Sequence, residues 1–155
     1  MRKKGREGLF HKKNFENVEK CDTFYVKISS MNENEIAQQV VDCCFNIHKK
    51  LGPGLFESVY EEIMDYELRK TGFLIERQKP IPVYWDGLKL DMGFRADFII
   101  ENKVIIEVKS IATIAHVHQK QVLTYLKLTN IKLGLLINYN EGLIKNGLKR
   151  IVNGL

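Results

Sequence analysis

The chain has 155 residues, which is enough for one domain with a buried core. Its 45% apolar and 28% charged residues are ordinary for a soluble globular protein. No apolar run approaches the roughly 18 residues that a membrane span needs. The basic start, MRKKGREGLFHKK, is not followed by the apolar stretch of a signal peptide. The sequence therefore excludes a membrane-embedded protein and predicts a cytoplasmic one.

Most of the net charge of +5 belongs to the beginning of the chain. Residues 1–30 carry eight basic and four acidic side chains, which leaves residues 31–155 with a net charge of +1. We therefore predict a flexible basic N-terminal extension over residues 1–30 and a domain over residues 31–155. A near-neutral domain can still bind a phosphate backbone through one local patch or a bound metal, so net charge does not decide the partner.

The cysteines support neither a disulfide framework nor a zinc or iron–sulfur site. Their number is odd, and Cys21, Cys43 and Cys44 form no Cys-x-x-Cys pair. Because Cys43 and Cys44 lie in a helical pattern, we expect buried structural thiols there.

Helical spacing begins after residue 31. Apolar residues recur at that spacing at Ile36, Val40, Cys43 or Cys44, Ile47 and Leu51. Asn32 or Asn34 is the candidate N-cap, and Gly52-Pro53-Gly54 ends the helix. A second helix is predicted over residues 55–70. Its apolar face should hold Phe56, Val59, Tyr60, Ile63 and Met64.

The pattern then changes to the alternation typical of strands, which are predicted at residues 73–78, 81–85, 94–100 and 103–109. Asp86-Gly87 and Glu101-Asn102 are the signals for tight hairpin turns. A helix over residues 115–128, an apolar strand over 131–138 that we expect to be central in the sheet, and a final helix over 143–152 follow. This order predicts an α/β sandwich in which helices cover a small sheet.

Two charges stand on a strand that otherwise reads as buried. Glu107 and Lys109 are two residues apart, so both project from one face of the strand. If residues 101–102 form a tight turn, opposed residues sum to 203 or 204, which places Asp97 near Glu107. Facing carboxylates repel unless a cation or proton lies between them, and hard oxygen ligands suit Mg²⁺ or Mn²⁺. The alternative is an internal salt bridge in which Lys109 neutralises one acid.

Polar residues on two helices are further candidates. Glu57 begins the second helix, where a glutamate can also simply match the helix dipole. His118, Gln121 and Tyr125 form one stripe at i, i+3 and i+7. Such a stripe can position a phosphate or a water, although an ordinary exposed helix face has the same pattern.

Residues 54–60, Gly-Leu-Phe-Glu-Ser-Val-Tyr, match the pattern that names the GxxExxY protein family. The segments FRADFIIENKVIIEVKS and HQKQVLTYLKLTNIKLGLLINYN also resemble that family, and the resemblance extends over residues 31–155. The family is similar to the PD-(D/E)XK nucleases, closest to their RecB-like branch. The resemblance implies a restriction-endonuclease-like core, a small mixed β-sheet flanked by helices. Ala96 stands where the superfamily motif has its proline.

The resemblance also implies roles for the candidate residues. Asp97, Glu107 and the Val108 carbonyl would bind Mg²⁺ or Mn²⁺, with Glu57 completing the site, and Lys109 would orient water or stabilise charge on the phosphate. Gln121 and Tyr125, with His118 beside them, would hold nucleic acid, and DNA is the favoured substrate. The implied activity is metal-dependent hydrolysis of phosphodiester bonds.

Two other functions fit the same residues. A non-catalytic nucleic-acid-binding or regulatory module could keep the nuclease fold and a vestigial site. A structural protein could use the same charged side chains as an internal ion network.

Overall fold

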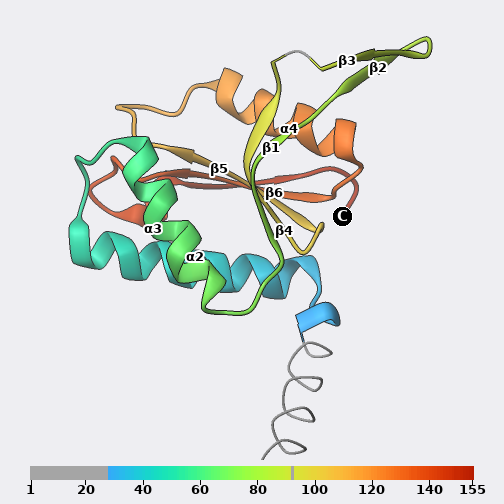
Figure 1. Cartoon of the computed structure of the whole chain (residues 1–155). Helices are drawn as coiled ribbons and strands as arrows, with labels where there is room; N and C mark the ends of the chain where they lie inside the picture. Colours follow the sequence, from blue (N-terminus) through green and yellow to red (C-terminus); the bar gives the residue numbers. More distant parts are fainter. Residues whose placement is uncertain (1–27, 92) are drawn as a thin grey trace, which may run out of the picture. The chain divides into compact units, whose positions relative to one another are not determined.

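The computed structural model describes residues 28–91 and 93–155 (Figure 1). The predicted basic extension lies outside these residues except for its last three, of which Ile28 and Ser29 are helical. Asn32–Leu155 form one folded unit, and the following description concerns that unit.

A five-stranded mixed sheet forms the centre of the unit. Its strands are β1 (Ile75–Pro80), β4 (Arg95–Ile100), β5 (Val104–Lys109), β6 (Leu133–Asn138) and β7 (Leu148–Val152), in the order β1-β4-β5-β6-β7. The β5 and β6 strands are parallel, and the other neighbours are antiparallel. The predicted fold class, a small mixed sheet flanked by helices, is confirmed.

Helices lie on both faces of the sheet (Figure 1). The α2 helix (Glu33–Leu51) and the α3 helix (Glu57–Arg69) cover one face, and α4 (His116–Thr129) covers the other. Asn32 caps α2 through a capping box, as predicted, and α2 ends at Gly52 with a φ of 67°. No helix in residues 28–91 or 93–155 is long and apolar enough to cross a bilayer.

The turn between β4 and β5 sets the register on which the site depends. Glu101 and Asn102 both have positive φ, as a two-residue hairpin turn requires. Ile99 is opposite Ile105, a sum of 204, which is one of the two predicted values and leaves residues 101–103 between the paired Ile100 and Val104. Both side chains pack with Leu126 of α4 in one buried cluster, so this face of the hairpin is the α4 face.

The apolar face predicted for the second helix is partly wrong. Tyr60 and Met64 are buried as expected, together with Leu68, but Phe56 is 83% exposed and Val59 is also exposed. The α3 helix begins only at Glu57, so Phe56 precedes its first turn in extended conformation and stays exposed.

The predicted final helix is also wrong. A short helix, α5 (Ile144–Gly147), is followed by β7, which pairs antiparallel with β6. Without β7, the fully buried β6 would be an edge strand with unpaired backbone groups, which is costly. That tertiary requirement overrides a segment whose local pattern resembles a helix.

Close packing between α4 and β6 gives a stability test. A Cβ atom added at Gly134 would lie 2.6 Å from Cγ1 of Val122, whereas one added at Gly142 would meet nothing within 4 Å. We expect Gly134→Ala to lower the free energy of unfolding by about 1–3 kcal/mol. The control Gly142→Ala should change it by less than about 0.5 kcal/mol. Urea denaturation of the two variants measures both values, and equal stability would contradict this packing.

Candidate active site

Asp97 and Glu107 lie near each other on two adjacent strands. The paired residues Ile99 and Ile105 lie on the α4 face, and Glu107 follows Ile105 by two residues, whereas Ala96 packs in the same cluster as Ile99, so strict alternation is broken next to Asp97. Both carboxylates are buried, and Glu107 is only 3% exposed. The backbone pairing of β4 with β5 ends at Phe98 and Ile106. Beyond that pair, Oδ2 of Asp97 accepts a hydrogen bond from the Val108 N–H at 2.8 Å.

Lys109 stands among the acids. Its Nζ donates to Oε1 of Glu107 at 2.8 Å and to the carbonyl oxygen of Val108 at 3.1 Å. The same Nζ lies 3.5 Å from Oε1 of Glu57. Lys109 therefore joins the strand acid Glu107 to the helix acid Glu57.

The turn before α3 brings Glu57 to this place. Oε2 of Glu57 accepts from the Ser110 N–H at 3.3 Å, and Oγ of Ser110 donates to the Leu55 carbonyl at 2.7 Å. The buried Tyr60 hydroxyl donates to the Gly52 carbonyl at 2.6 Å and accepts from the Leu55 N–H at 3.3 Å. Tyr60 thus closes the turn that precedes Glu57, and Ser110 fixes the turn to the end of β5.

The α4 helix contributes Tyr125 and Gln121. The Gln121 Nε2 donates to the Tyr125 hydroxyl at 2.5 Å, and the ring of Phe94 meets that of Tyr125 edge-on at 5.9 Å. Burial raises the pKa of Tyr125, and the charges of Glu107 and Asp97 raise it further, which places the hydroxyl within their field. His118 has a local partner, because its Nδ1 accepts from the Ala115 N–H at 3.0 Å.

Sequence reasoning missed two residues of this network, Gln78 and Glu61. The Gln78 Nε2 donates to Oε2 of Glu61 at 2.6 Å and to Oδ1 of Asp97 at 3.2 Å. Gln78 has a φ of 51° within β1, a conformation that costs free energy for a non-glycine residue. A glutamate four residues after Glu57, on the same side of the helix, was the available signal for Glu61.

Burial and mutual repulsion make the acids hold protons more tightly. Burial raises the pKa of Glu107 to about 7, with the charge of Asp97 as the next cause. Burial also raises the pKa of Asp97, and the Val108 N–H and Lys109 oppose that rise. The pKa of Lys109 is raised although burial opposes it, because Glu107 accepts its hydrogen bond and the other acids are near. This cluster would be relieved by additional positive charge.

Comparison with known proteins identifies the fold family. A model of the PD-(D/E)XK nuclease superfamily matches residues 34–151, which include every candidate residue. The chain belongs to the PD-(D/E)XK nuclease superfamily. Searches among curated proteins and among solved structures returned no match. Superfamily membership indicates a nuclease-type function and nucleic acid as the class of substrate.

PD-(D/E)XK nucleases generally depend on a divalent metal, and the donors here can be tested against that requirement. Oε2 of Glu107 is buried and has no hydrogen-bond partner among the described residues. A buried carboxylate oxygen without a partner is costly. Asp97 lies nearby, and the Val108 carbonyl adds a third oxygen. Carboxylate and carbonyl oxygens are the donors that Mg²⁺ and Mn²⁺ prefer, so the donor set fits such an ion.

The metal site formed by Glu57, Asp97 and Glu107 stays a prediction. Within residues 28–91 and 93–155, no three acidic, histidine or cysteine side chains form a group that could hold a metal ion. The Lys109 ammonium lies 2.8 Å from Glu107 and 3.5 Å from Glu57, where it supplies compensating positive charge.

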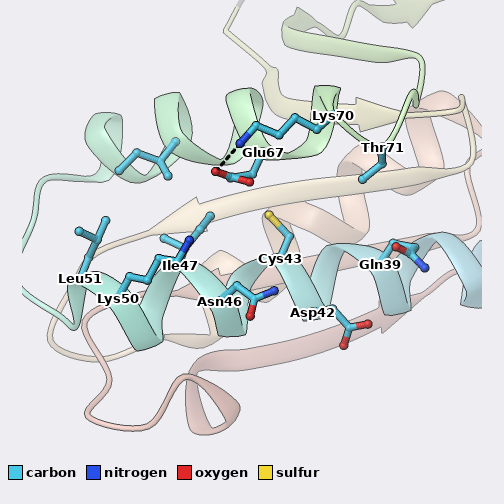
Figure 2. Close-up of a pocket in the computed structure, with 11 residues that line it drawn as sticks. Gln39, Asp42, Cys43, Asn46, Ile47, Lys50, Leu51, Glu67, Lys70 and Thr71 are labelled. Atoms are coloured by element: carbon cyan, nitrogen blue, oxygen red, sulfur yellow. Dashed lines mark hydrogen bonds and ion pairs between the residues drawn. The ribbon is translucent and has the colours of Figure 1, made fainter.

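A groove of about 760 Å³ between α2 and α3 lies apart from this PD-(D/E)XK site (Figure 2). None of the candidate residues lines it. Burial raises the pKa of its one thiol, Cys43, to about 11, so that thiol is protonated at neutral pH and is a poor nucleophile. Its Glu67 is ion-paired with Lys70. The groove therefore has no group prepared for phosphodiester chemistry.

The raised pKa of Glu107 predicts how stability depends on pH without metal. Between pH 4.5 and about 7 the folded protein keeps a proton that the unfolded chain releases, so stability is fully present below pH 4.5 and falls as pH rises through 7. The loss from this group should be on the order of 3 kcal/mol. Glu107→Gln should remove this pH-dependent loss of stability and leave the variant more stable than wild type at pH 8. Urea denaturation at several pH values in a chelator measures this, and parallel pH profiles for the two proteins would contradict it.

Proposed function

We propose that this protein is a metal-dependent phosphodiesterase that hydrolyses nucleic acid, with DNA as the favoured substrate and Mg²⁺ or Mn²⁺ as the metal. One observation carries the proposal: Glu107 is buried with one oxygen paired to Lys109 and the other without a partner among the described residues. A folded protein that maintains such a group beside Asp97 bears a cost, and a metal ion would offset that cost.

The residues proposed to hold the metal are Asp97, Glu107 and the carbonyl of Val108, with Glu57 directly or through water. When bound, the ion would polarise a phosphate oxygen and lower the pKa of a water. Asp97 is held for this role by the Val108 N–H and by Gln78, which fix both of its oxygens. Glu57 is held less tightly, by Ser110 and at a longer distance by Lys109, so it can adjust.

Lys109 is proposed to act on the reacting groups. Its ammonium would move from Glu107 toward the phosphate, where it would orient the attacking water or stabilise charge that develops on oxygen. Gln121 and Tyr125 form a hydrogen-bonded pair on α4 and would hold the nucleic-acid backbone near the acids. His118 precedes them on the same helix, and its part in binding the substrate is proposed from the same stripe.

A second function is favoured by one contact. Lys109 Nζ already bonds both Glu107 and the Val108 carbonyl, which are two of the proposed metal donors. A protein that kept this arrangement would be a non-catalytic nucleic-acid-binding or regulatory module whose own ammonium replaces the metal. The two functions differ in whether the acids bind a metal ion.

Variants of Asp97 and Lys109 separate these functions. Asp97→Asn should abolish stabilisation by Mg²⁺ and lower cleavage of DNA by at least about 100-fold, because a ligand charge is lost. Lys109→Ala should lower stability without metal by about 3 kcal/mol, because buried acids lose their partner. Millimolar Mg²⁺ should restore that loss, while cleavage stays low. Thermal unfolding with and without Mg²⁺, together with a nuclease assay, measures these effects.

Lys132→Ala is the matched control, because Lys132 is exposed and lies just before β6. It should leave stability, its response to Mg²⁺ and cleavage unchanged. If neither Mg²⁺ nor Mn²⁺ alters the wild-type melting curve and only Lys109→Ala is destabilised, the acids form an ion network and the nuclease proposal fails.

We also propose that residues 31–155 fold as a domain without residues 1–30. The superfamily match begins at residue 34, which supports this division. Deletion of residues 1–30 should leave the melting temperature and the response to Mg²⁺ unchanged. Circular dichroism of the shortened protein tests it, and an unfolded product would refute the division.

A further inference from the structure

A two-stranded hairpin extends beyond the main sheet (Figure 1). It consists of β2 (Val83–Trp85) and β3 (Leu88–Leu90), joined by the predicted turn at Asp86 and Gly87, both of which have positive φ. Trp85 is opposite Leu88 and Tyr84 is opposite Lys89. Opposed residues share a face, so one face carries Trp85 and Leu88 and the other carries Tyr84 and Lys89.

The hairpin exposes large side chains that a stable fold normally buries. Trp85 is 70% exposed, Tyr84 is 65% exposed, and Leu88 is also exposed. An isolated two-stranded hairpin is only marginally stable, and its residues here pair only with each other in a separate small sheet. Exposed aromatic side chains on such an element are typical of a binding surface.

The hairpin is an extension of the strands that form the candidate site. It connects β1, which carries Gln78, to β4, which carries Asp97. At its base the Ile81 N–H donates to the Phe94 carbonyl at 2.9 Å, and the Phe94 ring contacts Tyr125. One ligand molecule can therefore contact the hairpin and the candidate site at the same time.

The charges of the hairpin favour stacking over recognition of a duplex backbone. Lys89 is paired with Asp91 at 2.8 Å, and Lys79 at the base is paired with Glu76. Proteins that follow a duplex use many cations on its phosphates. Proteins that bind single strands place bases on aromatic rings, which requires few cations and tolerates any sequence.

We propose that the β2–β3 hairpin binds an unpaired stretch of nucleic acid, with a base stacked on Trp85, and so presents a single-stranded substrate to the acids. The inference rests on the proposed function and specifies its substrate class. The exposed Tyr84 ring would contact a neighbouring nucleotide from the other face.

A second copy of this chain is a weaker candidate for the same surface. The two rings and Leu88 offer on the order of a few hundred Å². A stable protein interface buries roughly 800 Å² on each partner. The hairpin alone is therefore too small to hold a dimer, whereas one or two stacked bases match its size.

Trp85 is the single tryptophan of the chain, so its fluorescence reports directly on the hairpin. The full chain is titrated with a dT20 oligonucleotide in a chelator, which prevents cleavage, and binding is followed in parallel by anisotropy of a labelled oligonucleotide. We expect saturable quenching of the tryptophan emission that follows the anisotropy, with weaker binding of a dA20–dT20 duplex.

Variants establish the role of the ring. Trp85→Ala should weaken binding of dT20 roughly tenfold, the loss expected for one stacked base, and Trp85→Phe should keep most of the affinity. Tyr66→Ala is the matched control, because Tyr66 on α3 is an aromatic side chain that is likewise 65% exposed. It should leave binding unchanged.

Several results would overturn the proposal. The first three are absence of dT20 binding, binding without a change in tryptophan emission, and preference for the duplex. The fourth is a Trp85→Ala variant that binds dT20 normally but changes from dimer to monomer in light scattering.

Cleavage with Mg²⁺ distinguishes the two proposals. Quenching without hydrolysis refutes only the nuclease function, and hydrolysis with unchanged emission and unaltered Trp85→Ala binding refutes only the hairpin.

Discussion

The structure depends on a pair of buried carboxylates on adjacent strands. Asp97 and Glu107 repel each other, and the hydrogen-bond donors around them compensate part of that repulsion. The Val108 N–H and Gln78 bond to Asp97, and Lys109 bonds to Glu107. The left-handed backbone of Gln78 belongs to the same arrangement, since its side chain reaches both Asp97 and Glu61. The strained backbone of Gln78 in β1 and the buried charge of Glu107 in β5 both cost free energy, and both belong to the same site.

The pattern Gly-x-x-Glu-x-x-Tyr has a physical interpretation in this chain. Gly54 has a φ of 109°, which side chains rarely adopt, so the turn before α3 requires glycine. Tyr60 is buried against Tyr139, with ring centroids 4.2 Å apart, and its hydroxyl bonds two backbone groups of the turn. The glycine and the tyrosine therefore hold the backbone that carries Glu57, and only the glutamate is free for chemistry.

Local signals predicted the parts of the fold that local interactions determine. The turn signal at residues 101–102 limited the sum of opposed residues to 203 or 204, which was sufficient to place Asp97 near Glu107, and the observed pairing has the sum 204. The sequence failed where distant segments decide the outcome. β7 forms because β6 needs a partner, and Phe56 is exposed because α3 begins one residue after it. Gln78 and Glu61 lie 17 residues apart and show their role only through the hydrogen bond between them. The position of Glu61 four residues after Glu57 was a signal for Glu61 alone, and no sequence pattern marks Gln78 as its partner.

The tight turn at Glu101 and Asn102 also has a consequence for the order of assembly. Asp97, Glu107 and Lys109 belong to one hairpin, and such hairpins close within microseconds, because little chain entropy is lost. The repelling acids therefore acquire their ammonium partner in the same folding event that brings them together. Glu57 and Tyr125 come from distant segments and join only when the helices dock on the sheet, which takes longer because their contacts are nonlocal. A chain still emerging from the ribosome can thus hold its acids neutralised while the surroundings needed to hold a substrate are incomplete.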